Sequence, residues 1–256
     1  MRRRLLPVVT LLALAARAHA EPNDLIARPL VLAEGQLEAT LVADINLAPR
    51  QLGTSTSLAP DVWYGVLPRL TVGLIHSNVS VDRFAPGATF CVVHQPVLGC
   101  EDTYHGSGID ARWSVRDGDL AIAPRARVLV RELDPFKPAI TLGALVRWTR
   151  GRFAITGDPY LQLGLANTER GNRAWLFLPV SFAVQPLARW EVAVHTGYNS
   201  EVANLRDGWH VPVVLATRVR ADERFDVGAM LAFASLLGPQ NTAKERALFF
   251  TLSFRS

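Results

Sequence analysis

Arginine recurs at alternate positions through the middle of the chain. Arg125 and Arg127 are two residues apart, and Arg112 and Arg147 lie in neighbouring segments with the same alternation. Residues two apart in a β-strand share one face of the sheet. A guanidinium group cannot lose its charge in a protein, so it must meet water, a carboxylate or an anionic solute. The chemistry that such a strip supports is the selection of ions or solutes by charge.

The segments that would carry these arginines alternate apolar and polar residues with a period of two. There are about twelve, each roughly 8 to 14 residues long, the length that a tilted membrane-spanning strand requires. No segment after residue 20 is apolar and long enough for a membrane-spanning helix. The expected strands are 36–47, 57–67, 69–78, 107–116, 119–131, 138–149, 152–166, 174–186, 189–199, 208–220, 224–236 and 245–254.

Short and long connections alternate between these segments. The connections near residues 68, 117, 151, 187 and 222 are tight, whereas those at 48–56, 79–106, 132–137, 167–173, 200–207 and 237–244 are longer on average. Outer-membrane barrels have short turns at the periplasmic end and longer loops outside the cell. The fold class predicted is all-β, a transmembrane antiparallel up-and-down β-barrel of about 12 strands.

Alternation alone does not separate a barrel in lipid from a water-soluble sandwich, because both have one apolar face. Aromatic residues near the short turns favour lipid, since they are typical of an interfacial girdle. The last strand is aromatic-rich, like the terminal assembly signal of outer-membrane proteins, although Phe254 is followed by Arg255 and Ser256. The girdle residues are Trp113, Trp148, Phe153, Trp190 and Phe225.

In a barrel, the charged face lines the interior. Arginines of the fourth to sixth strands would then face acids across the lumen and set a field for ion or solute selection. The alternative is that these groups pair and fill the barrel as a salt-bridged plug. The expected lumen residues are Arg112, Arg125, Arg127, Arg147, Glu38, Asp44, Asp158 and Asp226.

The N-terminus has the layout of a secretory signal peptide. Arg2 to Arg4 form a basic start, Leu5 to Ala16 are mostly apolar, and Ala18-His19-Ala20 is a small-x-small cleavage site. We expect residues 1–20 to be removed and residues 21–256 to form one barrel domain. The leader holds four of the 27 basic residues, which leaves 23 against 23 acidic ones. The neutral mature chain gives no electrostatic support to nucleic-acid binding.

Cys91 and Cys100 are the only cysteines, and both lie in the long connection 79–106. In an exported protein, a disulfide between them is the expected state. A metal site that also uses His94 and His105 is the lesser alternative, and we expect no metal and no cofactor.

Two hairpin starts share a turn-arginine-apolar pattern, in Leu67-Pro68-Arg69-Leu70-Thr71-Val72-Gly73 and Glu223-Arg224-Phe225-Asp226-Val227-Gly228. The pattern resembles a broad family of outer-membrane barrels associated with phenol meta-cleavage pathways, which are porin- or transporter-like. The resemblance implies an outer-membrane location and passage of small solutes or ions, but it names no solute. Lipid and the outer-membrane assembly machinery are the other expected partners.

One short run bears on an enzymatic function. Outer-membrane phospholipase and deacylase barrels resemble each other in a His-x-Ser-Asn run, whose His and Ser share a face. Here His76-Ser77-Asn78 lacks the intervening residue, so the two side chains would point to opposite faces. We therefore expect a pore, not an enzyme. The alternatives are a non-conducting structural or surface-binding barrel and, third, a lipid-modifying enzyme.

Overall fold

The computed structural model describes residues 25–47, 56–78, 89–92, 103–239 and 241–256. Within these ranges, no helix is long and apolar enough to cross a membrane. The 3-10 helices are η2 (Thr168–Arg170) and η3 (Val202–Asn204). The strands are β1 (Leu37–Asn46), β2 (Thr56–Leu67), β3 (Leu70–Ile75), β4 (Phe90–Cys91), β5 (Ser107–Trp113), β6 (Leu120–Leu133), β7 (Phe136–Arg150), β8 (Phe153–Gly157), β9 (Tyr160–Gly164), β10 (Trp175–Leu187), β11 (Trp190–Glu201), β12 (Trp209–Arg220), β13 (Phe225–Leu237) and β14 (Thr242–Arg255).

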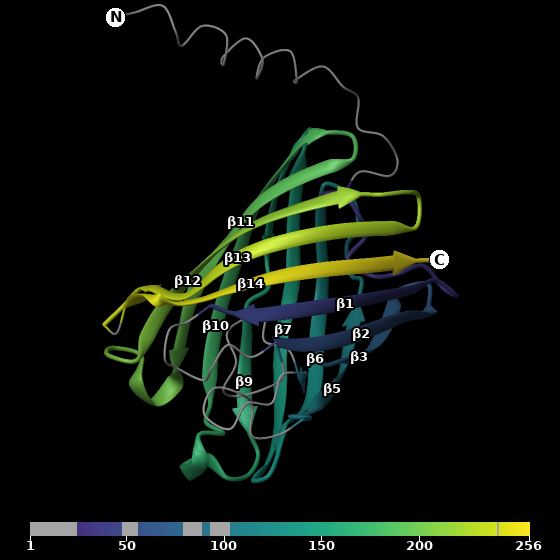
Figure 1. Cartoon of the computed structure of the whole chain (residues 1–256). Helices are drawn as coiled ribbons and strands as arrows, with labels where there is room; N and C mark the ends of the chain where they lie inside the picture. Colours follow the sequence, from purple (N-terminus) through teal and green to yellow (C-terminus); the bar gives the residue numbers. More distant parts are fainter. Residues whose placement is uncertain (1–24, 48–55, 79–88, 93–102, 240) are drawn as a thin grey trace, which may run out of the picture.

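The strands close into a barrel. Apart from β4 and the two short strands β8 and β9, each strand pairs antiparallel with the strand before it and the strand after it, and β1 pairs both with β2 and with β14 (Figure 1). β8 and β9 both lie between β7 and β10 and act as one interrupted strand. β4 has two residues and adds only to the end of β2. The result is the expected 12-stranded up-and-down barrel, and both the fold class and the strand number are confirmed.

The outer and inner faces of the barrel differ in polarity. Outward-facing Val128 and Leu142 are large, apolar and more than half exposed. Inward-facing Asp61 and Asp110 are almost fully buried. This distribution is the inverse of a water-soluble sandwich and suits a barrel with lipid outside. The expected girdle residues all have exposed side chains: Trp113, Trp148, Phe153, Trp190 and Phe225.

The connection between β6 and β7 differs from the expected alternation of short turns and long loops. The segment 132–137 was expected to be a long connection. Instead, β6 and β7 pair as far as Leu133 and Phe136, which leaves only Asp134 and Pro135 between them. The pairing shifts register between Val130 and Leu133, and this irregularity lets the strands extend beyond their alternating cores.

We call the end that holds Leu37 and the C-terminus the short-turn end, and the opposite one the long-loop end.

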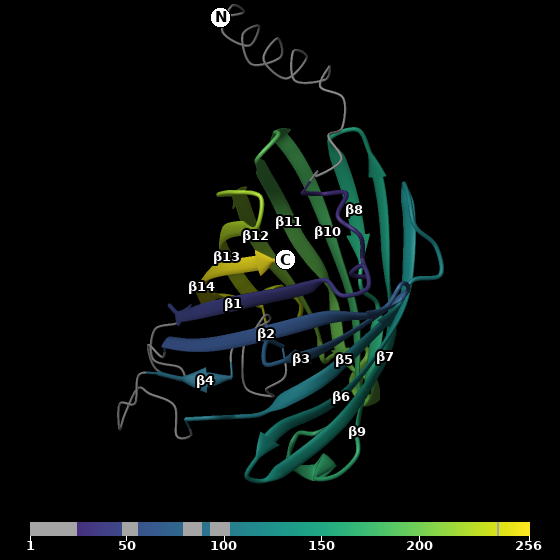
Figure 2. The ribbon, with the colours of Figure 1, turned by 90° about the vertical axis from the view of Figure 1, so that its right-hand side faces the viewer.

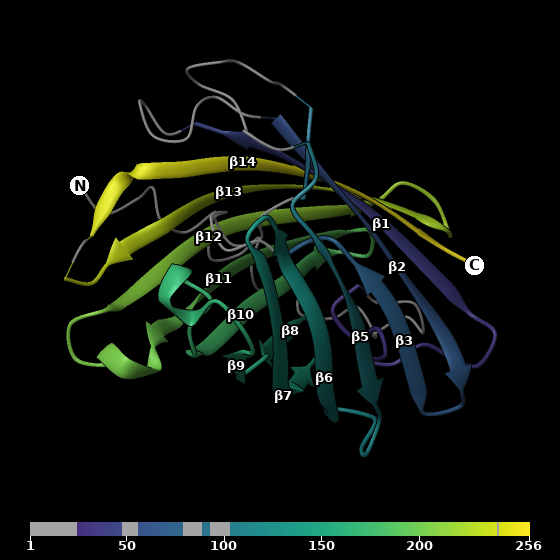
Figure 3. The same cartoon turned by 90° about the horizontal axis from the view of Figure 1, so that it is seen from below.

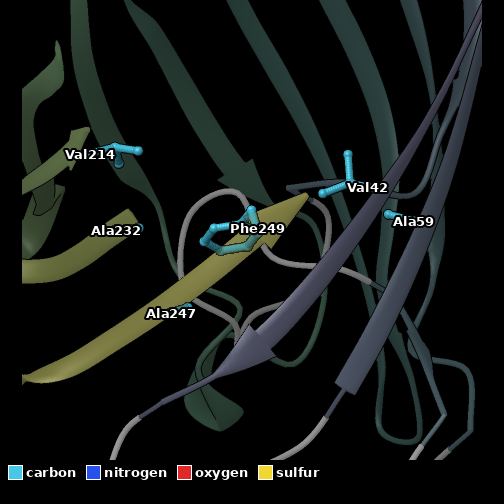
Figure 4. Close-up of a cluster of buried hydrophobic side chains, with 6 residues drawn as sticks. All are labelled: Val42, Ala59, Val214, Ala232, Ala247 and Phe249. Carbon is cyan, nitrogen blue, oxygen red and sulfur yellow. The ribbon is translucent and has the colours of Figure 1, made fainter. Parts of the chain in front are cut away.

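Part of the barrel interior is apolar. Phe249 of β14 is fully buried and packs on the inner face with small residues from neighbouring strands (Figure 4). Small inward side chains leave room for one large ring, which is how a narrow barrel fills its interior. This patch lies across the barrel from the arginine-bearing strands. The cluster comprises Val42, Ala59, Val214, Ala232, Ala247 and Phe249.

A charge placed on the outer face tests this orientation. We expect Val128→Arg to lower the free energy of unfolding by about 2–4 kcal/mol, the cost of arginine at the bilayer midplane. Leu165→Arg, in the connection after β9, is the matched control. Its side chain is also exposed, but near the membrane interface the cost is about 0–1 kcal/mol. Urea unfolding in liposomes measures both, and equal losses would contradict the assignment.

Candidate functional site

A buried carboxylate joins three arginines on the inner face of β5 and β6. Oδ1 of Asp110 accepts a hydrogen bond from Nε of Arg112 at 2.8 Å. Its Oδ2 accepts from Nε of Arg125 at 2.5 Å and of Arg127 at 3.0 Å. Strand register produces the arrangement, because Asp110 lies opposite Arg127 and Arg112 lies opposite Arg125. Three cations therefore surround one anion with no exposed surface.

Asp158 completes this group, which we call the arginine wall: Asp110, Arg112, Arg125, Arg127 and Asp158. Its Oδ2 accepts hydrogen bonds from Nη1 of Arg125 at 2.5 Å and from Nη2 of Arg127 at 3.4 Å. Its Oδ1 is buried and has no hydrogen-bond partner among the residues that the structure describes. The wall thus holds three guanidinium groups and two carboxylates, and its formal charge is nearly balanced.

The break between β8 and β9 brings Asp158 to the wall. There Pro159 and Tyr160 approach β7 so closely that a Cβ on Gly143 would lie 2.3 Å from the carbonyl oxygen of Pro159. Only glycine allows this approach without a shift of the backbone. The sequence 152–166 alternates like a single strand, so the break was not expected.

Aromatic rings flank the arginine wall. The guanidinium of Arg112 lies 5.0 Å from the centroid of the Trp63 ring, and that of Arg127 lies 5.1 Å from the Tyr160 ring. These distances are within the range of a cation–π interaction. Tyr160 in turn stacks on Phe177, with centroids 4.6 Å apart, and Trp175 stacks on Phe177 at 6.0 Å. A ladder of rings therefore continues from the wall along β10.

The other expected lumen residues also lie on the inner face, but away from the wall. Arg147 donates a hydrogen bond to the carbonyl oxygen of Arg28, and Asp226 forms a salt bridge with Arg28. Glu38 accepts a hydrogen bond from Nε of Arg255 at 2.9 Å. Asp44 is buried on β1. The eight residues therefore do not form a single strip.

Two residues of the interior ion pairs, Asp110 and Arg28, were not predicted from the sequence. Asp110 is two residues before Arg112, so the rule that assigned Arg112 to the inner face applies to it as well. Arg28 precedes the first alternating segment, and no periodic pattern marks it. Its partner Asp226 is 198 residues away in the chain.

His76 and Ser77 have separate partners. Oγ of Ser77 donates to Oδ2 of Asp61, and Nδ1 of His76 lies 2.6 Å from the carbonyl oxygen of Pro60. The backbone N–H groups of both residues also donate to Asp61. Asp61 therefore holds the end of β3, and the imidazole is not placed to activate the serine hydroxyl.

The cysteine pair falls partly outside the described residues. Cys91 ends β4, whereas Cys100 and His94 lie outside the described ranges, so the disulfide between Cys91 and Cys100 stays a prediction. Within the part of the chain that the structure describes, no three His, Cys, Asp or Glu residues are grouped as metal ligands would be.

Solved structures of bacterial channels share this architecture. The NanC porin has a TM-score of 0.60 at 6% identity, over 84% of this chain and 98% of its own. The KdgM porin in complex with disordered oligogalacturonate has a TM-score of 0.58 at 5% identity, over 85% and 98%. The COG4313 outer membrane channel from Pseudomonas putida F1 has 0.54 at 10%, over 94% and 100%.

These likenesses show a shared fold. The chain is a closed barrel of the architecture that these outer-membrane channels have. No protein-family model matches the sequence, and no curated protein is similar to it in sequence. None of the comparisons shows the association with phenol meta-cleavage pathways.

The balance of charge at Asp110 can be tested directly. Asp110→Asn removes the shared partner of three arginines, and breaking a buried ion pair in this way costs about 3–5 kcal/mol. We expect the urea midpoint of the refolded barrel to fall accordingly. Adding Arg112→Gln should restore part of the loss, because one unpaired cation is removed. An unchanged midpoint for Asp110→Asn would show that water already solvates the arginines of the arginine wall.

Proposed function

We propose that the chain is an outer-membrane pore that lets small polar solutes or ions cross. The observation that carries the proposal is the closed barrel with an apolar outer face and a charged inner face. Such a barrel has no exposed strand edge and presents a largely apolar face to lipid. The fold that it shares with known channels supports the same function, as does the expected export signal in residues 1–20.

The arginine wall supplies the selective element of the proposed pore. A guanidinium cannot be neutralised by losing a proton, so an ion passing the wall always meets its charge. The wall keeps one more cation than anion, and this excess favours anions. The ring ladder Tyr160–Phe177–Trp175 lies beside the wall and offers apolar faces to the same path.

A non-conducting structural barrel is the second candidate, and the pairing within the wall favours it. Asp110 binds all three arginines of the wall, and Phe249 fills part of the interior on the other side. Paired charges and packed rings can close a narrow lumen. The two candidates differ in one observable, the conductance of the refolded chain in a planar bilayer.

Ion selectivity tests the role of the wall. Arg125→Gln with Arg127→Gln removes two positive charges and leaves Asp110 and Asp158 in place. We expect the reversal potential in a KCl gradient to shift toward cation selectivity while the barrel still folds, because lumen substitutions tune selectivity.

The matched control for this variant is Arg173→Gln. Arg173 pairs with Glu201 in the exposed region of the long-loop end, so its loss should leave the reversal potential unchanged. A double variant with the reversal potential of the wild type would show that the wall does not contact the permeating ion. If the wild type, the double variant and the control variant all fail to conduct, the structural barrel is the better account.

A further inference from the structure

The chain before β1 lies inside the barrel. Residues 25–36, which we call the N-terminal segment, run within the ring of strands at its short-turn end (Figures 2 and 3). Four of its apolar side chains are almost fully buried although they belong to no strand. They are Leu25, Ile26, Val31 and Leu32. A segment buried in this position occupies the path that a solute would take.

Contacts of the segment reach most of the circumference. Besides β2, it is bound by β3, β7, β10, β12 and β13, which lie on different sides of the ring. Leu32 N donates to Oγ1 of Thr71 at 2.7 Å, and Ile26 N donates to Oε1 of Gln185 at 3.3 Å. Nη2 of Arg218 donates to the carbonyl oxygen of Leu25 at 3.1 Å. The segment therefore spans the cross-section instead of following one strand.

Arg28 is the charged centre of these contacts. Its guanidinium binds both carboxylate oxygens of Asp226, with Nη2 at 3.0 Å from Oδ1. Arg147 binds the carbonyl oxygen of the same residue. Paired N–H···O bonds to a carboxylate are directional as well as charged. Two of the eight expected lumen residues thus serve to hold the segment.

Gly65 of β2 makes room for the end of the segment. Its N–H donates to the carbonyl oxygen of Gln36 at 2.9 Å, and its carbonyl oxygen accepts from Gly35 N at 2.8 Å. A Cβ on Gly65 would lie 1.9 Å from the carbonyl oxygen of Ala33, and its three nearest atoms all belong to the segment. The side chain of any other residue at position 65 would push the N-terminal segment away from β2.

We propose that the N-terminal segment is a plug bound in the short-turn end of the pore, and that its release opens the pore. This inference rests on the proposed pore function. Most of the contacts join one atom of the segment to a different strand, so the plug can leave without breaking the ladder that closes the barrel. The mature chain that remains after cleavage at residue 20 would then contain the segment that closes its own pore.

Single-channel conductance with an added peptide tests the plug. The mature chain 21–256 is compared with a chain that lacks residues 21–32, which keeps the turn before β1. We expect the shortened chain to conduct at least severalfold more. A synthetic peptide of residues 21–32, at about the millimolar effective concentration of a short tether, should close it from the short-turn side only. The same peptide with Arg28→Ala should close it poorly.

A point variant covers the case in which the shortened chain does not fold. Gly65→Ala in the full chain should also raise conductance, because the new Cβ displaces the segment. Gly157→Ala is the matched control, since a Cβ there meets no atom closer than 3.7 Å, and it should conduct as the wild type does.

The outcomes separate the plug from the pore. Equal conductance in the full chain, the shortened chain and Gly65→Ala would overturn the plug and leave the pore standing. Silence in all of them, with folding confirmed by gel migration before and after heating, would overturn the pore and the plug together.

Discussion

The rest of the structure depends on the need to satisfy every backbone hydrogen bond in lipid. A strand in the hydrocarbon region cannot leave an open edge, because no water is present to replace the missing partner. Here β1 meets that need by pairing with β2 on one side and β14 on the other. The ladder continues beyond the strand ends, where Leu47 N bonds Arg246 and Ser256 N bonds Leu37. Once the ring is closed, each residue faces either lipid or the interior.

Closure of the barrel also determines which partners the charged side chains of the interior can reach. Inward-facing arginines cannot reach the bulk water outside the barrel. Strand register must therefore place carboxylates beside them, or they must face water in the lumen. β5 and β6 place Asp110 among three arginines, and the broken strand adds Asp158. At the short-turn end, the chain itself supplies a partner, because Arg28 enters the ring and binds Asp226. In the proposed pore, the position of the N-terminal segment would decide whether this interior is open or closed.

Sequence periodicity predicts the parts of this structure that depend on neighbouring residues in the chain. Period-two alternation places Arg125 and Arg127 inside and Val128 outside, and the connections set the strand number. The rest depends on contacts between distant segments. The register that joins Asp110 to Arg125 is set by closure, and the break before Tyr160 needs Gly143 on the neighbouring strand. Nothing local marks the N-terminal segment, since its partners are spread around the ring.

The central claim is that the polar face of the barrel lines an interior and that the apolar face meets lipid. The solvent accessibility of the two faces tests this claim. Spin labels at single cysteines, in a chain whose two native cysteines are replaced by serine, report collisions with lipid-soluble oxygen and a water-soluble nickel complex. Labels at Val128 and Leu142 should collide with oxygen and not with nickel, and labels at Leu129 and Thr141 should be shielded from oxygen. The same accessibility at all four positions, or the inverse pattern, would contradict the account.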